Sequence, residues 1–273
     1  DEATVEVAGV ADAFGGTANE TTLTADRIED MNIVFTEEPA ALGNMTFAAA
    51  TTLDLTVNSG SDVTAAGITA GAATDVQLTA NDDFTVTSGT NPNFASNATV
   101  TVDGSGDVDL ATLEDSAAQT VNATALTGSL TVTAGSTTAS IQGGSGNDGI
   151  TGSAATADID GNGGNDTLTG GSGAENIDGG TGNDTIDGNG AADTINGGEG
   201  NDRLLFANSS ELGTDASVDG GAGTDTIEFG NNTTDIEDGD LANVAANSIE
   251  VINLTGSSAN TFNAAYGTNA DAA

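Results

Sequence analysis

The stretch GGSGNDGIT (143–151) is followed without a gap by six further segments of nine residues. They are GSAATADID (152–160), GNGGNDTLT (161–169), GGSGAENID (170–178), GGTGNDTID (179–187), GNGAADTIN (188–196) and GGEGNDRLL (197–205). One related segment, GGAGTDTIE (220–228), follows after an interruption. Self-similarity at a fixed short period is the signature of a solenoid, so this repeat predicts the fold.

The spacing within each segment predicts a turn of six residues followed by a strand of three, so that two segments complete one coil. Position eight is aliphatic throughout, and its neighbours are mostly polar, which places position eight inside the coil and its neighbours outside. Glycine at the turn positions permits the tight backbone that such short coils need. We therefore predict an all-β fold, a right-handed parallel β-solenoid of the β-roll type. The inward residues are Ile150, Ile159, Leu168, Ile177, Ile186, Ile195 and Leu204.

Position six carries an acidic residue in almost every segment, and residues two segments apart fall on the same edge of the roll. Neighbouring coils lie ~4.8 Å apart, so these carboxylates repel one another unless a cation lies between them. Ca²⁺ takes six to eight oxygen ligands, and turn carbonyls can complete its shell. We predict three Ca²⁺ gaps on one edge and one on the other. The first edge carries Asp148, Asp166, Asp184 and Asp202, and the opposite edge carries Ala157, Glu175 and Asp193.

The isolated segment places Asp225 at the same position six, and we include it among the predicted Ca²⁺ ligands. It lies outside the register of the preceding segments, so its stacking partner is left open.

Composition excludes several other kinds of chemistry. The chain has 273 residues, with 42 Asp and Glu, two Arg (Arg27 and Arg203), no Lys, no His and no Cys, giving a net charge of −40. Without His or Cys there is no Ser-His-Asp or Cys-His nucleophile and no zinc site of the usual kind. Nucleic acid and anionic membranes normally require a cationic patch, so neither is expected as a partner. No run of 18 apolar residues occurs, so no membrane insertion is predicted.

The rest of the chain divides around the repeat. Val132 and Ile141 continue the nine-residue spacing upstream, so we expect a roll over 128–205 that is continuous with an irregular β-solenoid-like region over 1–127. A loop insertion is predicted for 206–219, with Phe206 and Leu212 as packing residues, followed by a final turn and a C-terminal β segment over 220–273. The chain opens Asp1-Glu2-Ala3, and we expect it to be a fragment of a longer protein.

The nonapeptides, together with GGAGTDTIEF (220–229) and NSIEVINLTGSSANTF (247–262), resemble the calcium-binding RTX segments of bacterial surface-layer proteins. The resemblance covers about 128–262. It implies export by type I secretion, an unfolded state at low cytosolic Ca²⁺, folding outside the cell, and assembly into a lattice bridged by Ca²⁺.

Three functions follow as hypotheses. The first is a structural, non-enzymatic component of an extracellular bacterial surface layer that folds and self-associates on Ca²⁺. The second is an RTX adhesin or biofilm-matrix protein that uses the roll as a rigid spacer. The third is the Ca²⁺-binding tail of a secreted enzyme, whose catalytic part would have to lie outside these residues. We expect no catalytic residues within the chain.

Overall fold

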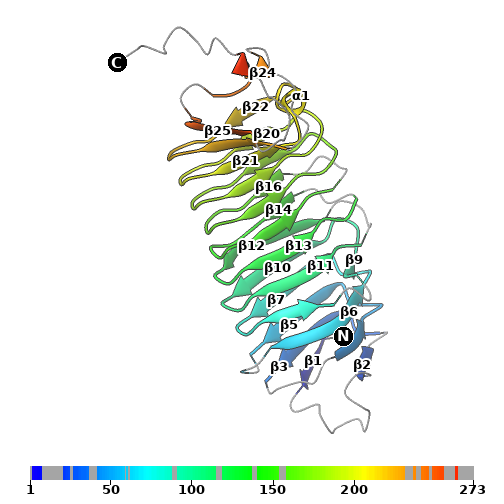
Figure 1. Ribbon diagram of the computed structural model, residues 1–273. Helices are drawn as coiled ribbons and strands as arrows, with labels where there is room; N and C mark the ends of the chain where they lie inside the picture. The colour runs from blue at the N-terminus through cyan, green and yellow to red at the C-terminus, as the bar shows by residue number, and fades with distance from the viewer. Residues whose placement is uncertain are drawn as a thin grey trace.

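The computed structural model describes residues 2–7, 21–24, 27–36, 42–58, 60, 62–87, 91–114, 119–136, 140–153, 158–230, 236–237, 241–245, 248–254 and 262–263. In this part the chain winds into an elongated parallel β-solenoid (Figure 1). Strands from successive coils stack along its axis and form two long sheets. The predicted all-β solenoid is confirmed, because the described helix content is α1 (Ser209–Leu212) alone. No helix among the described residues is long and apolar enough to cross a membrane.

Successive strands alternate between the two sheets, which we name sheet A and sheet B. Sheet A contains β1 (Glu2–Val7), β3 (Asp30–Phe35), β5 (Thr52–Val57), β7 (Asp75–Ala80), β10 (Thr99–Gly104), β12 (Thr120–Leu126), β14 (Ser140–Gln142), β16 (Asp158–Asp160), β18 (Asn176–Asp178), β20 (Thr194–Asn196) and β22 (Ser217–Asp219). Sheet B contains β2 (Thr21–Thr24), β4 (Leu42–Thr46), β6 (Val63–Ala70), β8 (Phe84–Val86), β11 (Val108–Thr112), β13 (Leu130–Thr133), β15 (Gly149–Thr151), β17 (Thr167–Thr169), β19 (Thr185–Asp187), β21 (Arg203–Phe206), β23 (Thr226–Phe229) and β25 (Val251–Leu254). The short strand β9 (Asn93–Phe94) pairs with β6, and β24 (Ile236–Glu237) pairs with β26 (Phe262–Asn263).

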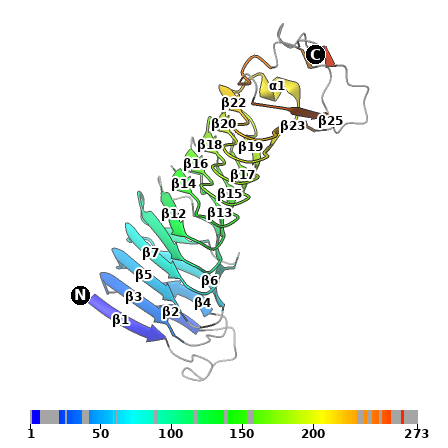
Figure 2. The same cartoon turned by 90° about the vertical axis from the view of Figure 1, so that its left-hand side faces the viewer.

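The solenoid has a wide N-terminal part with long strands and a narrow roll with short strands (Figure 2). In the wide part, Thr52 pairs with Asp75, and the interior holds large rings such as Phe35, Phe47 and Phe84, all fully buried. In the roll, strands of three residues bury their central side chain only. The roll therefore has a much thinner apolar core per coil than the part that precedes it.

The predicted inward positions of the nonapeptides are confirmed. In sheet B, Ile150 pairs with Leu168, which pairs with Ile186. In sheet A the same ladder runs through Ile159, Ile177 and Ile195, which makes one coil of two nonapeptides. All seven position-eight side chains are at most 2% exposed: Ile150, Ile159, Leu168, Ile177, Ile186, Ile195 and Leu204.

The roll is joined to the wide part without a break in either sheet. β14 pairs with β12, and β15 pairs with β13, where Val132 lies opposite Ile150. The aliphatic ladder of the roll therefore starts inside the last wide coils.

Residues 206–219, expected as a loop, hold regular structure instead. They contain α1 and β22, and Ser217 of β22 pairs with Thr194 of β20, so the insertion enlarges a coil and the stack continues. Phe206 and Leu212 are buried as predicted, and the rings of Phe206 and Phe229 lie 6.1 Å apart. The next coils pair Arg203 with Thr226 and Thr226 with Val251.

The glycine at position four of the turn is required by two features together. Its φ is positive, a region that side chains other than glycine rarely adopt. A Cβ there would also lie directly against a backbone carbonyl of the preceding coil, because the coils are closely stacked. The residues with both features are Gly164 (φ 122°), Gly182 (φ 129°), Gly200 (φ 140°) and Gly223 (φ 152°).

We predict that Gly182→Ala lowers the free energy of unfolding by about 3 kcal/mol, through backbone strain and the clash with the Gly164 carbonyl. The matched control is Gly190→Ala, because a Cβ at Gly190 would meet no atom within 4 Å. That variant is expected to stay within about 1 kcal/mol of the parent protein. Denaturant unfolding at constant calcium measures both, and equal effects would contradict the assignment.

The opposite change is expected at Ala191, which occupies position four of its turn with φ 147°. A non-glycine residue in this region is strained, so Ala191→Gly should raise the free energy of unfolding by about 1 kcal/mol. The same denaturant titration tests it, and a destabilised variant would count against strain at this position.

Candidate metal centre

The acidic residues of the first edge form a continuous buried ladder. In each step, the backbone N–H of one aspartate donates to Oδ1 of the aspartate one coil further on. Asp148 donates to Asp166 at 2.7 Å, Asp166 to Asp184 at 2.7 Å, and Asp184 to Asp202 at 2.8 Å, each 18 residues apart. The predicted stacking of these four residues is therefore what the structure shows.

The second carboxylate oxygen is the notable feature of this ladder. Oδ2 of Asp166, Asp184 and Asp202 is buried and has no hydrogen-bond partner. Asp148 differs, because its Oδ2 accepts the N–H of Gly144 at 2.7 Å and its Oδ1 accepts the N–H of Leu130. An unpartnered buried carboxylate oxygen is costly, and burial without a partner is normally relieved by a proton or a cation.

The first glycine of each turn keeps the space beside this oxygen open. A Cβ on Gly179 would lie 2.5 Å from Oδ2 of Asp184 and directly against the carbonyl oxygen of Gly197 in the next coil. Gly161 has the same relation to Asp166 and to the Gly179 carbonyl. A carboxylate oxygen and a carbonyl oxygen from neighbouring coils thus face one small space, which is the donor set that Ca²⁺ takes.

The last members of the ladder lie outside the consecutive nonapeptides. Asp202 N–H donates to Oδ1 of Asp225 at 2.8 Å, and Asp225 N–H donates to Oε2 of Glu250 at 2.9 Å. Asp225 is fully buried, and its Oδ2 has no partner. The structure therefore supplies the stacking partner of Asp225 that the sequence left open, across a larger coil of 23 residues.

The second edge is shorter. Glu175 N–H donates to Oδ1 of Asp193 at 2.9 Å, and both carboxylate oxygens of Glu175 are buried without a partner. Asp193 N–H donates in turn to Oδ1 of Asp215 at 3.2 Å. Ala157, at the start of this edge, lies outside the described residues. Sequence reasoning missed Asp215, because it belongs to the insertion and to no nonapeptide.

A second ladder, also missed from sequence, accompanies the first. Oδ1 of the asparagine at position five accepts the backbone N–H of the asparagine one coil further on. The distance between the two atoms is 2.7 Å for Asn147–Asn165 and Asn165–Asn183, and 2.6 Å for Asn183–Asn201. Its hydrogen bonds run in the opposite direction to those of the aspartates. The Asn-Asp pair therefore ties each turn to both neighbouring coils, which fixes where the carboxylates lie. The repeated Asn-Asp dipeptide is the sequence signal that could have shown it.

Burial raises the pKa of the ladder carboxyls, because it disfavours the charged form. The pKa of Asp166 rises to about 7 and that of Asp202 to about 6, with the neighbouring aspartates of the ladder adding to the effect. Burial and then the adjacent Asp193 raise the pKa of Glu175 to about 7. These groups therefore keep a proton to higher pH than an ordinary carboxyl, unless a cation takes the place of the proton.

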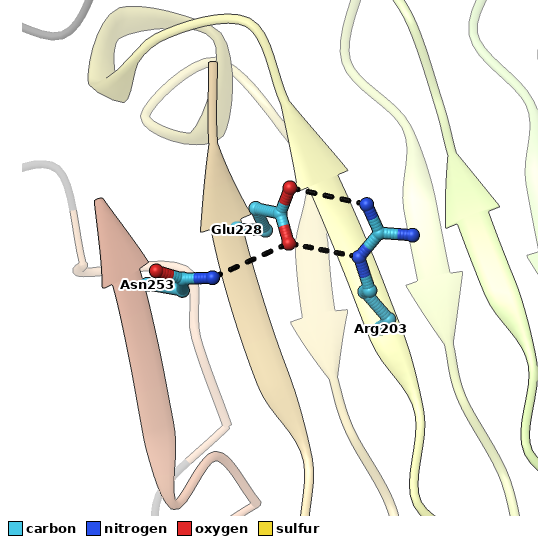
Figure 3. A network of polar contacts seen from close by, with 3 residues as sticks. All are labelled: Arg203, Glu228 and Asn253. Atoms are coloured by element: carbon cyan, nitrogen blue, oxygen red, sulfur yellow. Dashed lines mark hydrogen bonds and ion pairs between the residues drawn. The ribbon is translucent and has the colours of Figure 1, made fainter. Parts of the chain in front are cut away.

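Neither cationic side chain of the protein neutralises the ladder. Arg203 points to the outer face of sheet B and donates two hydrogen bonds to Glu228, at 2.8 and 3.0 Å, while Asn253 donates to the same carboxylate (Figure 3). These bonds from Arg203 lower the pKa of Glu228. Arg27 is exposed before β3. A charge to balance the buried carboxylates must therefore come from solution.

The donors present fit Ca²⁺ better than a metal that needs a dense side-chain cage. Among the described residues, no three acidic side chains converge on one point. Each gap instead offers carboxylates from two coils and backbone carbonyls. Hard oxygen donors of this kind suit Ca²⁺, which accepts carbonyl ligands and irregular geometry.

Comparison with known proteins agrees with this geometry. A model of the RTX calcium-binding nonapeptide repeat (4 copies) matches residues 133–168 and again residues 169–204. No curated protein and no solved structure matches the chain. RTX calcium-binding repeats are thus present, and such repeats bind Ca²⁺, so this β-roll is a calcium-binding one. The ligands Asp148, Asp166, Glu175, Asp184, Asp193, Asp202 and Asp225 remain a prediction for the individual sites.

We predict that the calcium-depleted protein loses stability as pH rises from about 4 to about 7. The folded-state pKa of Asp166 is about 7, above the ordinary value of 3.8, so folding favours the protonated group and the gain disappears as the pH passes the folded value. The melting temperature at pH 5 should exceed that at pH 7.5. Saturating Ca²⁺ should remove this difference, because the ions bind the ionised carboxylates.

Two variants distinguish the effect of the buried ladder on the pH dependence from the effect of the protein's overall charge. Asp166→Asn removes a buried titrating group and should weaken the pH dependence, whereas Asp158→Asn removes the same charge from an exposed strand position and should not. A calcium-free melting temperature that rises with pH would contradict the prediction.

Proposed function

We propose that this protein is a structural component of an extracellular bacterial surface layer, which folds and assembles when it binds Ca²⁺. The observation that carries the proposal is the ladder of buried carboxylates with unpartnered oxygens. Each gap is made by two neighbouring coils, so the site does not exist in an unfolded chain. Binding of Ca²⁺ and formation of the coil are therefore coupled.

The same coupling supports an extracellular location. A roll that needs cations at several gaps is best supported where Ca²⁺ is plentiful, and RTX repeat proteins are typically secreted and extracellular. The resemblance to surface-layer segments adds export by type I secretion. The chain then remains unfolded before export and folds when it meets external Ca²⁺.

Assembly is supported by shape and charge. The solenoid is an elongated body whose long faces are repetitive, which suits side-by-side packing in a lattice (Figure 1). Its net charge of −40 makes identical molecules repel one another. Contacts between copies therefore depend on bridging cations, and Ca²⁺ serves both inside the roll and between molecules.

The elongated shape also favours the second candidate, an RTX adhesin or biofilm-matrix protein in which the roll is a rigid spacer. The two candidates share the calcium-dependent roll and differ in how molecules associate. No catalytic role is proposed, since the chain lacks the His and Cys on which many hydrolytic sites rely.

Chelation followed by restoration of Ca²⁺ tests the proposal. Circular dichroism should show loss of strand content with chelator and its recovery with Ca²⁺, with residues 143–228 most affected. Electron microscopy of the purified protein in Ca²⁺ should then show ordered sheets. Mg²⁺ at the same concentration is the control and should support neither, because it prefers a strict octahedral shell.

An unchanged spectrum on chelation would rule out calcium-coupled folding. Recovery of the fold with isolated rods and no sheets would reject the surface layer and favour the adhesin.

A further inference from the structure

The insertion between the nonapeptides supplies a buried acidic residue that no repeat predicts. Asp215 lies between α1 and β22 and is 3% exposed. Its Oδ1 accepts the N–H of Asp193, 22 residues earlier, which is the same relation that joins successive aspartates within the roll. The insertion therefore lengthens the coil and still returns a carboxylate to the second edge.

Asp193, the other member of the pair, carries a carboxylate oxygen that has no hydrogen-bond partner. Its side chain is fully buried, and Oδ2 makes no hydrogen bond. A Cβ on Gly188 would lie 2.7 Å from that oxygen and 3.1 Å from Cδ1 of Ile195, so the absence of a side chain at Gly188 leaves space beside the oxygen.

The charge around the pair is uniformly negative. Asp193 and Glu211 both act on the carboxyl of Asp215, and Glu211 is held nearby by a hydrogen bond from Ala207 N–H to its Oε2. Arg203 is engaged with Glu228, so no cationic side chain reaches the pair. Two buried carboxylates in adjacent coils thus require a charge from solution.

The insertion holds Asp215 in place. Leu212 of α1 is fully buried, Thr214 donates its hydroxyl to the carbonyl of Ala191, and Asn243 donates to the carbonyl of Asp215 at 2.6 Å. The backbone on both sides of the carboxylate is therefore anchored to neighbouring coils, and the site is preorganised.

We propose that Asp193 and Asp215 bind a divalent cation of the Ca²⁺ class, one coil beyond the last nonapeptide of the second edge. The proposal rests on the calcium binding of the roll and adds a site whose second carboxylate, that of Asp215, lies outside the matched repeats. The ion ties the helical insertion to the roll and adds to the contacts that already anchor it.

The test is a count of bound Ca²⁺ on the full chain by native mass spectrometry and equilibrium dialysis. Asp215→Asn keeps an oxygen that can accept the Asp193 N–H but removes the charge, and it should bind one ion fewer than the parent protein. Its calcium-induced rise in melting temperature should also be smaller. The matched control, Asp158→Asn, removes one charge from an exposed position of sheet A and should retain both values.

An unchanged count and an unchanged rise in melting temperature for Asp215→Asn would overturn the site and indicate that the pair holds a proton. If Asp215→Asn does not regain strand content in excess Ca²⁺, Asp215→Glu decides, since it restores a carboxylate. Recovery of strand content by that variant in excess Ca²⁺ supports the site, because a carboxylate is then what position 215 requires, and failure of that variant as well overturns it. Neither readout depends on sheet formation, so rejection of the surface-layer proposal would leave this site standing.

Discussion

The repulsion between carboxylates stacked one coil apart is the constraint on which the structure of the roll depends. Each ladder aspartate is buried, uses one oxygen to accept an N–H from the preceding coil, and leaves the other without a partner in most coils. A close stack of like charges is unfavourable unless cations lie between them. The stability of the roll therefore depends on cations from the solution, and its oxygen donors suit calcium.

The wide and the narrow parts of the solenoid are stabilised by different interactions. The wide N-terminal coils bury large side chains, among them Phe35, Phe47 and Phe84. The narrow coils bury one aliphatic side chain per strand, and so they gain much less from the hydrophobic effect. Cation binding compensates for that thin core, which explains why the acidic ladder begins at Asp148, close to where the strands shorten to three residues. We therefore expect the stability of the narrow roll to depend more strongly on calcium than that of the wide N-terminal coils.

Glycine and asparagine in the turns serve the same constraint. Position-four glycines allow a backbone that passes directly against the preceding coil, and position-one glycines leave room beside the free carboxylate oxygen. The asparagine ladder ties the coils with hydrogen bonds that need no ion. Each recurring residue of the nonapeptide therefore has a separate physical role in the close stacking of the coils.

Sequence alone determined the regular part of this protein. A strict period of nine fixes coil length, so the inward residues from Ile150 to Leu204 and the stacking of Asp148, Asp166, Asp184 and Asp202 followed from counting. Counting failed where the coil length changes. Only the tertiary structure decided that Asp225 stacks on Asp202, that Asp215 continues the second edge and that residues 206–219 include a helix and a strand. The physical reason is that an enlarged coil keeps its register through strand pairing and packing across the interior, which no local spacing encodes.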